Sequence, residues 1–369
     1  MAAITAEDRQ ALVDSLRRLL EDKSSEADVR RTMETAEGYD PALWRQLAEM
    51  GVVGVIVEED FGGVGAGPME LERIMEEAGA ALLCSPLISS GVLAAGLIQA
   101  LGDQAAKTRL LPGIADGGAI ATVAMAGPKG GWTEADVSVV ASAGETAGLS
   151  GTASFVTHGQ VASVLLVVAR APDGLAVYEV DPHAKGVAIK PLPTFDHTTR
   201  LADIAFDGAE GRRLAATRPV WPAVEAALDL TRVALAGEQA GGAKRALDFT
   251  VDYAKTRAQF GRLIGSFQAI KHMAADLLLE TESAISAARA AARSLAEGAP
   301  DARAAIDLAA FACADAFSQV TATAIQMHGG IAFTWAHPAH LYLRRARADA
   351  QLFGNSTFYR ERYLQALGA

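Results

Sequence analysis

The feature that most constrains the fold is a hydrophobic period that changes twice along the 369 residues. Up to about residue 120 the apolar residues recur at helical spacing, as Leu12, Leu16 and Leu19 do. Between about 120 and 210 they fall into short β-rich runs, separated by turn signals such as Ala171-Pro172-Asp173-Gly174. From about residue 221 the helical period returns in longer segments. Helix, then β, then helix is an unusual order, so few fold classes remain open.

The middle segment predicts strands at the spacing of a small antiparallel barrel or sandwich. They cover Ser150–Thr157, Val164–Ala169, Gly174–Val180, Val187–Pro191 and Leu201–Phe206. In the first segment a helix is expected over 103–111, ending before Pro112. We therefore predict an α+β chain with a helical domain at 1–119, a β-domain at 120–218 and a helical bundle at 219–369.

Charge and composition restrict the classes of binding partner and the cellular compartment that we expect. The formal net charge of -11 argues against non-specific binding to nucleic acid or to an anionic membrane. Residues 1–8 lack the regions of a signal peptide, and the apolar stretch Val92–Leu101 is too short to span a bilayer. Cys84 and Cys313 lie in apolar surroundings without zinc spacing, which favours buried, reduced thiols. We expect a cytoplasmic protein with no nucleic-acid, membrane or metal partner.

Two short stretches of the last segment suit a phosphate-bearing ligand. Arg257 stands beside Phe260-Gly261, and a guanidinium can hold a pyrophosphate by paired, charge-assisted hydrogen bonds. In Gln326-Met327-His328-Gly329-Gly330, the two glycines lack the Cβ that would block a phosphate or an adenine. On residue types alone, the alternatives are a solvated surface arginine and a tight helix end. His328 is expected to pack at the loop.

In this order, four stretches resemble the acyl-CoA dehydrogenase family over nearly the whole chain. They are Trp44–Gly51 running on to Glu58–Gly63, then Phe155-Val156-Thr157, then Tyr253–Gly261 with Gln268, and finally Gln326–Gly330 followed by Arg344. The resemblance implies an N-terminal helical domain, a middle β-domain and a C-terminal four-helix bundle. It also implies FAD that reaches into a neighbouring subunit.

The resemblance further implies a reaction and a set of roles. A carboxylate removes the α-proton of an acyl-CoA, the β-hydride passes to the flavin, and electrons leave to an electron-transfer flavoprotein or a similar acceptor. The implied FAD-binding residues are Arg257, Phe260, Gln268, Gln326, Gly329, Gly330 and Thr157. Other interpretations stay open for three of them: a core aromatic for Phe260, a local turn cap for Gln268, and an ordinary strand residue for Thr157.

The chain departs from the family at the positions of the catalytic base, the group that removes the α-proton of the substrate. Counted from Arg344, the usual glutamate falls on Phe353, and the alternative base position of the family falls on Thr231. Neither side chain can accept a proton near neutral pH. The loop Ala124–Trp132 also lacks the hydroxyl and carboxylate groups that serve the flavin and the acyl-CoA in the family.

Residues lent across a subunit interface are thus present, whereas those used within one subunit are altered. This asymmetry predicts a hetero-oligomer, such as the α2β2 acyl-CoA dehydrogenases of actinobacterial steroid catabolism, that is active only with a base-bearing subunit. Two alternatives remain. One is a self-sufficient homotetramer with Asp349 or Asp229 as base, although both are expected to be solvated helix-face charges. The other is a catalytically silent scaffold. The acyl chain, whether straight, branched or steroid, is left open.

Overall fold

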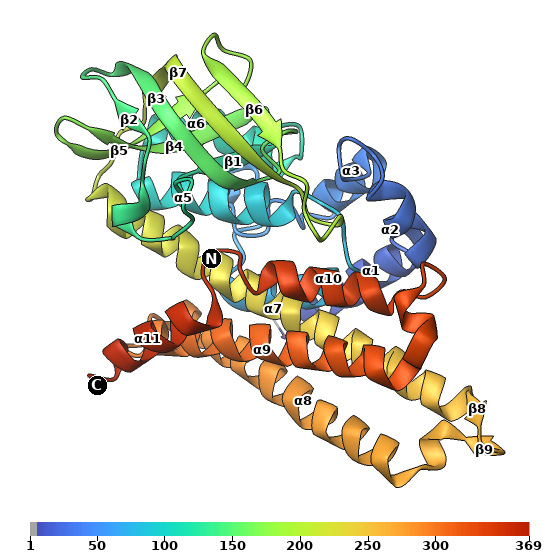
Figure 1. The fold of residues 1–369 in the computed structure, drawn as a ribbon. Helices are drawn as coiled ribbons and strands as arrows, with labels where there is room; N and C mark the ends of the chain where they lie inside the picture. Colours follow the sequence, from blue (N-terminus) through green and yellow to red (C-terminus); the bar gives the residue numbers. More distant parts are fainter. Residues whose placement is uncertain (1–5, 369) are drawn as a thin grey trace. The chain divides into compact units, whose positions relative to one another are not determined.

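The computed structural model describes residues 6–368, so the N-terminal residues 1–5 considered above lie outside the described residues. The chain forms two compact units, and each is described by itself (Figure 1). The helical unit holds the described residues up to Arg31, residues 68–83 and the chain from Arg232 onward. The mixed unit holds residues 32–67 and 84–231. The division into three domains at 119 and 218 stays a prediction.

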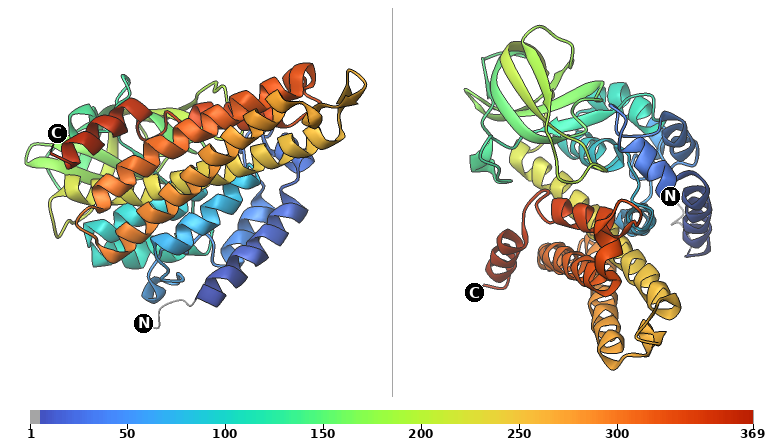
Figure 2. Two further views of the ribbon diagram at one scale, coloured as in Figure 1. Left: turned by 90° about the horizontal axis from the view of Figure 1, so that it is seen from below. Right: turned by 45° about the vertical axis from the view of Figure 1, so that its right-hand side comes forward.

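Long helices build the helical unit. They are α1 (Ala6–Lys23), α2 (Glu26–Thr32, as far as Arg31), α4 (Pro68–Ala80), α7 (Val220–Thr256, from Arg232), α8 (Gln268–Glu297), α9 (Ala302–His328), α10 (Ala339–Asp349) and α11 (Ser356–Ala366). A hairpin of β8 (Ala258–Gln259) and β9 (Arg262–Leu263) joins α7 to α8 and projects from the end of the bundle away from α11 (Figures 1 and 2). The buried faces of α7, α8 and α9 are rich in alanine, which allows the helices to pack closely.

Helices α4 and α7 meet backbone to backbone. A Cβ built on Gly241 would lie on the carbonyl of Glu76, and one on Gly79 would lie on the carbonyl of Glu238. On Gly237 it would stand 2.6 Å from the Glu72 carbonyl oxygen. No side chain larger than hydrogen fits these three places without moving a helix.

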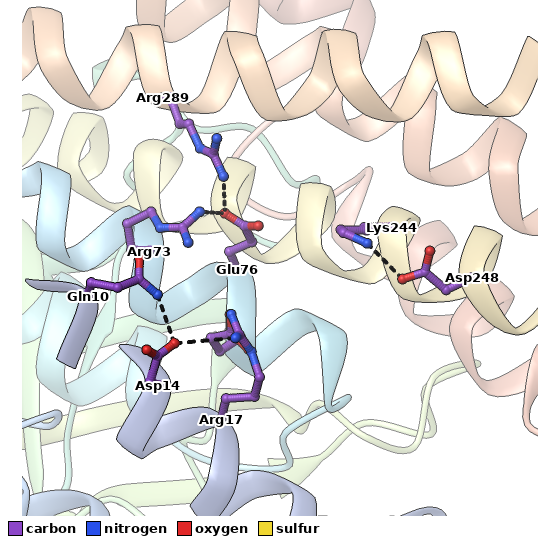
Figure 3. A network of polar contacts seen from close by, with 9 residues as sticks. Gln10, Asp14, Arg17, Arg73, Glu76, Lys244, Asp248 and Arg289 are labelled. Carbon is purple, nitrogen blue, oxygen red and sulfur yellow. Dashed lines mark hydrogen bonds and ion pairs between the residues drawn. The ribbon is translucent and has the colours of Figure 1, made fainter. Parts of the chain in front are cut away.

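Charged side chains then tie α1 and α8 to α4, and Figure 3 shows the contact between α8 and α4. Arg289 of α8 reaches Glu76 at 3.2 Å, and Arg73 donates to the same carboxylate. Arg17 of α1 donates to both oxygens of Glu77, at 2.5 and 3.0 Å. Because the glutamates are largely buried, these pairs are screened less than exposed ones.

Glu72, on α4, is a buried carboxyl that these cations do not reach. The residue is 1% exposed, and its Oε1 has no hydrogen-bond partner among residues 6–368. Burial, with a smaller contribution from Glu76, raises the pKa of Glu72 from 4.5 to about 7. Arg289 and Arg73 oppose that shift without cancelling it.

The mixed unit is built on one sheet with short helices beside it. Its strands are β1 (Ala121–Ala124), β2 (Val140–Ala141), β3 (Thr146–Thr157), β4 (Val164–Ala171), β5 (Gly174–Val180), β6 (Val187–Pro191) and β7 (Leu201–Arg213). The pairings β4–β2, β2–β3, β3–β7, β7–β5 and β5–β4 close a ring, so of the two predicted alternatives, barrel or sandwich, the strands form a barrel. Its interior holds apolar residues such as Leu149, Val167 and Ile204. The helices of this unit are α3 (Pro41–Glu49), α5 (Ala95–Leu101) and α6 (Gln104–Ala115), with a π-helix over Leu87–Ala94.

Three details differ from the sequence predictions. The barrel is not purely antiparallel, because β4 pairs in parallel with both β1 and β2, two strands too short to be recognised from their residues. Helix α6 continues through Pro112 to Ala115, so the missing N–H of proline costs one bond without ending the helix. Among the described residues there is also a longer apolar helical segment, Ala302–Phe333, that the sequence analysis did not identify. By length and composition it could cross a membrane, but 56% of its most apolar window is buried, as in a core helix.

Cys84 and Cys313 are buried thiols without a disulfide, as predicted.

The buried acid predicts a pH-dependent stability. Between pH 4.5 and about 7 the folded chain keeps the Glu72 proton and the unfolded chain releases it, so stability is lost as pH rises through this window. Glu72→Gln, which is neutral at every pH, should be more stable than the wild type at pH 8 by roughly 3 kcal/mol, and about equal to it at pH 4.5. Denaturant unfolding at both pH values measures this. Glu282→Gln, an exposed site on α8, is the control and should change neither value.

Candidate functional site

The predicted cofactor residues of the helical unit share one end of its bundle, which we call the bundle tip: Arg257, Phe260, Gln268, Gln326, Gly329 and Gly330. Helix α7 ends at Thr256, the β8–β9 hairpin follows, and α8 starts at Gln268. Helix α9 runs back along α8 and ends at His328, beside the same hairpin end (Figure 2). Segments far apart in the sequence are thereby brought to one place.

Arg257 and Phe260 are presented to solvent. The amide of Arg257 donates to the Tyr253 carbonyl at 2.8 Å, which extends the last turn of α7. Its guanidinium is exposed and makes no hydrogen bond or ion pair within the described chain. Phe260 is 92% exposed with φ at +54°, so the interpretation as a core aromatic is wrong. A left-handed phenylalanine held out in water is a costly arrangement that points to a function.

The two glycines leave a bare backbone at the end of α9. Gly329 has φ +68° and ψ -147°, a conformation essentially confined to glycine. A Cβ on either Gly329 or Gly330 would meet nothing within 4 Å. Gln326 is exposed on the last turn of the same helix. The C-terminal end of a helix carries partial negative charge, so α9 supplies no positive charge for a pyrophosphate, whereas the Arg257 guanidinium can.

Gln268 does not act as a turn cap, and its role toward the cofactor stays a prediction. It is exposed and is the first residue of α8, and the residue that precedes the helix as N-cap is Phe267. Its side-chain amide bonds the ring Nε2 of His272 at 2.9 Å, one turn along. The interpretation as a turn cap is therefore wrong, and the amide oxygen is left available to a ligand.

A set of stacked rings holds the two halves of the bundle tip together. The Tyr253 ring lies 4.4 Å from the His328 ring at 26°, and its hydroxyl donates to the His328 carbonyl at 3.5 Å. Tyr253 is one turn before Arg257, and His328 directly precedes Gly329. His328 is 5% exposed, so the prediction that it packs at the loop is confirmed. Sequence reasoning missed its partner Tyr253, whose only signal was one aromatic within a motif.

These features fit an FAD pyrophosphate and adenosine at the bundle tip. An unpaired guanidinium supplies charge, an exposed Phe260 ring supplies a stacking face, and Gly329-Gly330 admits close approach. Within residues 6–368 no group of three histidine, cysteine, aspartate or glutamate side chains is arranged to hold a metal ion.

The two positions where the base would stand offer no proton acceptor. Phe353 is 1% exposed with φ +59°, in the turn after α10, and its carbonyl accepts from the Tyr359 hydroxyl at 2.6 Å. Thr231 is fully buried, and its hydroxyl donates to the Ala227 carbonyl at 2.7 Å. Asp349 is 2% exposed, so the expectation of a solvated charge is wrong, because α10 packs this face inward. Asp229 is half-buried.

Thr157 belongs to the mixed unit. It is 4% exposed at the end of β3, and its carbonyl accepts from the Thr122 hydroxyl at 2.6 Å. Nearby Phe155 stands at an irregularity of β3 with φ +58° and is 37% exposed, beside Gly130 of the altered loop. A role of Thr157 toward a flavin stays a prediction.

The two glycines predict different stability changes for the same substitution. Gly329→Ala should destabilise the chain by about 1–3 kcal/mol, because alanine is strained at this φ and ψ. Gly330→Ala should stay within about 0.5 kcal/mol of the wild type, since its Cβ meets nothing. Denaturant unfolding of the two variants decides the matter, and equal effects would contradict the geometry.

Comparison with known proteins accounts for this architecture. Residues 6–118 match the family model of the acyl-CoA dehydrogenase N-terminal domain, and residues 221–368 match that of the C-terminal domain. Acyl-CoA dehydrogenase IpdE2 of Mycolicibacterium smegmatis is 34% identical over 355 residues, which cover 95% of each chain. Among solved structures, the ChsE4–ChsE5 complex of Mycobacterium tuberculosis is 28% identical with a TM-score of 0.89, covering 100% of this chain and 99% of that one. A variant of the Tcur3481–Tcur3483 steroid acyl-CoA dehydrogenase is 29% identical with a TM-score of 0.88, covering 98% of both chains. The chain belongs to the acyl-CoA dehydrogenase family.

Proposed function

We propose that this chain is the subunit without the catalytic base in a hetero-oligomeric, FAD-dependent acyl-CoA dehydrogenase. Members of the family use FAD, which accepts the hydride when bound. In this proposal Arg257 binds the FAD pyrophosphate, and Phe260, Gln268 and the Gln326–Gly330 segment bind the adenosine side. A partner subunit supplies the carboxylate that removes the α-proton of the acyl-CoA.

The observation that carries the proposal is Phe353. Its backbone is fixed in a left-handed turn by the buried Tyr359 hydroxyl, and its side chain is a hydrocarbon. Arg232 approaches the same hydroxyl at 3.4 Å and is itself 1% exposed, so this turn is firmly held. A proton cannot be taken at this position whatever the rotamer, and Thr231 already donates its own proton elsewhere.

The relatives support a heteromeric assembly and a steroid-type substrate. One solved neighbour is a complex of two differently named chains, and another is named as a steroid acyl-CoA dehydrogenase. By analogy we infer an α2β2 complex in the cytoplasm that acts on a steroid or related lipid acyl-CoA. Electrons would leave to an electron-transfer flavoprotein or a similar acceptor.

Removing the guanidinium tests the cofactor role. The complex is purified through a tag on this chain from cells that make its natural partner. Arg257→Gln should lower the FAD content of that complex at least about tenfold, because a neutral amide replaces a charge-assisted pair. Absorbance at 450 nm per protein measures this. Arg293→Gln, an exposed arginine of α8, is the matched control and should keep its flavin. A silent scaffold would keep it in both variants.

A second candidate function keeps the base in this chain, and the burial of Asp349 is the observation that favours it. Under our proposal, Asp349→Asn should change kcat per bound flavin less than about threefold, because the partner removes the proton. Loss of a true general base costs about 10²–10⁴-fold. Asp229→Asn, at a half-buried site, is measured in parallel. A loss of that size in either variant, with flavin retained, would make this chain the proton acceptor.

A further inference from the structure

Three helices end or begin at one cluster of rings, which we call the ring stack: Phe249 and Tyr253 of α7, His328 at the end of α9, and His337 before α10. The His328 ring lies 4.4 Å from Tyr253 and 4.3 Å from His337. Phe249 touches both histidines edge-on, at 5.7 and 5.8 Å. The stack therefore fixes the whole loop from Gly329 to His337 against the end of α7, where Arg257 follows.

The hydrogen bonds of the two histidines define their proton states. His328 Nδ1 lies 2.8 Å from the Ala324 carbonyl, which can only accept, so this nitrogen carries the proton. His328 Nε2 is buried and has no partner in the described chain. His337 Nδ1 accepts from the Ala339 amide at 3.2 Å and must be unprotonated. Both rings are neutral in this arrangement.

A second proton on either ring would disrupt this arrangement. On His337 it would remove the acceptor that satisfies the first turn of α10, and it would place a cation at the N-terminus of a helix. On His328 it would bury a charge beside a second imidazole. Two cationic rings 4.3 Å apart also repel each other.

The surroundings favour the neutral forms. Burial lowers the pKa of His328 from 6.5, and burial followed by the nearby His328 lowers the pKa of His337. From α2, Arg30 acts in the same direction and Glu26 opposes it, while His340 of α10 adds to the lowering. From α7 the titratable group is Tyr253. Since the neutral rings are favoured in the folded state, this local stability is complete above pH 6.5 and declines as pH falls below it.

We propose that His328 and His337 are positioning residues for FAD. As neutral rings they hold the Gly329–His337 loop against Tyr253 near the end of α7, and on protonation they release the loop and the flavin. The identity of the ligand, FAD, rests on the proposed function. The pH-dependent release of the loop does not depend on it. Protonation of the two histidines would therefore weaken flavin binding by the assembly at low pH, although neither histidine takes part in the reaction.

His337→Asn separates titration from structure. An asparagine side-chain oxygen can still accept from the Ala339 amide two residues on, yet it does not titrate between pH 5 and 8. In the tagged complex, the Kd for FAD of the wild type should rise about fivefold or more between pH 7.5 and 5.5, and that of the variant should rise much less. His183→Asn, at an exposed turn of the mixed unit, is the control and should follow the wild type.

The loop itself gives a readout without flavin or activity. Hydrogen exchange of residues 329–337 in the full chain, corrected for the intrinsic pH dependence of exchange, should speed up below pH 6.5 in the wild type and much less in His337→Asn, where only His328 still titrates. Equal protection at pH 7.5 and 5.5, or a variant that keeps the wild-type response, would overturn the inference. If Arg257→Gln keeps its flavin, the proposed function fails, and loop exchange still decides the role of the two histidines.

Discussion

Everything in the helical unit depends on how closely α4 approaches α7. Gly79, Gly237 and Gly241 let carbonyl groups of one helix lie where side chains of the other would stand. That spacing brings the α4 glutamates within reach of arginines on α1 and α8, and it sets the axis along which α7 delivers Arg257 to the bundle tip. The short contact distance also leaves Glu72 enclosed without a counter-ion of its own among the described residues, and it explains why a carboxyl there holds its proton near neutral pH.

The bundle tip and the Phe353 turn are built in opposite ways. At the tip, charge and bare backbone are left exposed, as suits a ligand held mainly by another subunit. At the Phe353 turn the opposite holds, because the backbone is bonded within the chain and the side chain is apolar. In the proposed function, the first region binds a ligand and the second offers no proton acceptor.

Much of this could be predicted from the sequence, for physical reasons that differ from element to element. Long amphipathic helices and the strands Gly174–Val180 and Val187–Pro191 follow from their hydrophobic periods. Strands β1 and β2 do not, since four- and two-residue strands carry no period and form only by pairing with longer strands, β1 with β4 and β2 with β3 and β4. Helix α6 passes Pro112 because tertiary packing compensates one missing bond. The burial of Asp349 and the stacking of Tyr253 on His328 arise from contacts between distant segments, which no local pattern encodes.

The hydrogen bond from Tyr359 engages the main chain at position 353 and does not depend on which side chain stands there. The backbone conformation at position 353 and the chemical nature of its side chain are thus set by different contacts. In a lineage that begins with identical copies of such a subunit, a single replacement at this position can remove the proton acceptor from one copy while the main-chain hydrogen bond stays. Division of labour between sister polypeptides is then accessible in one step.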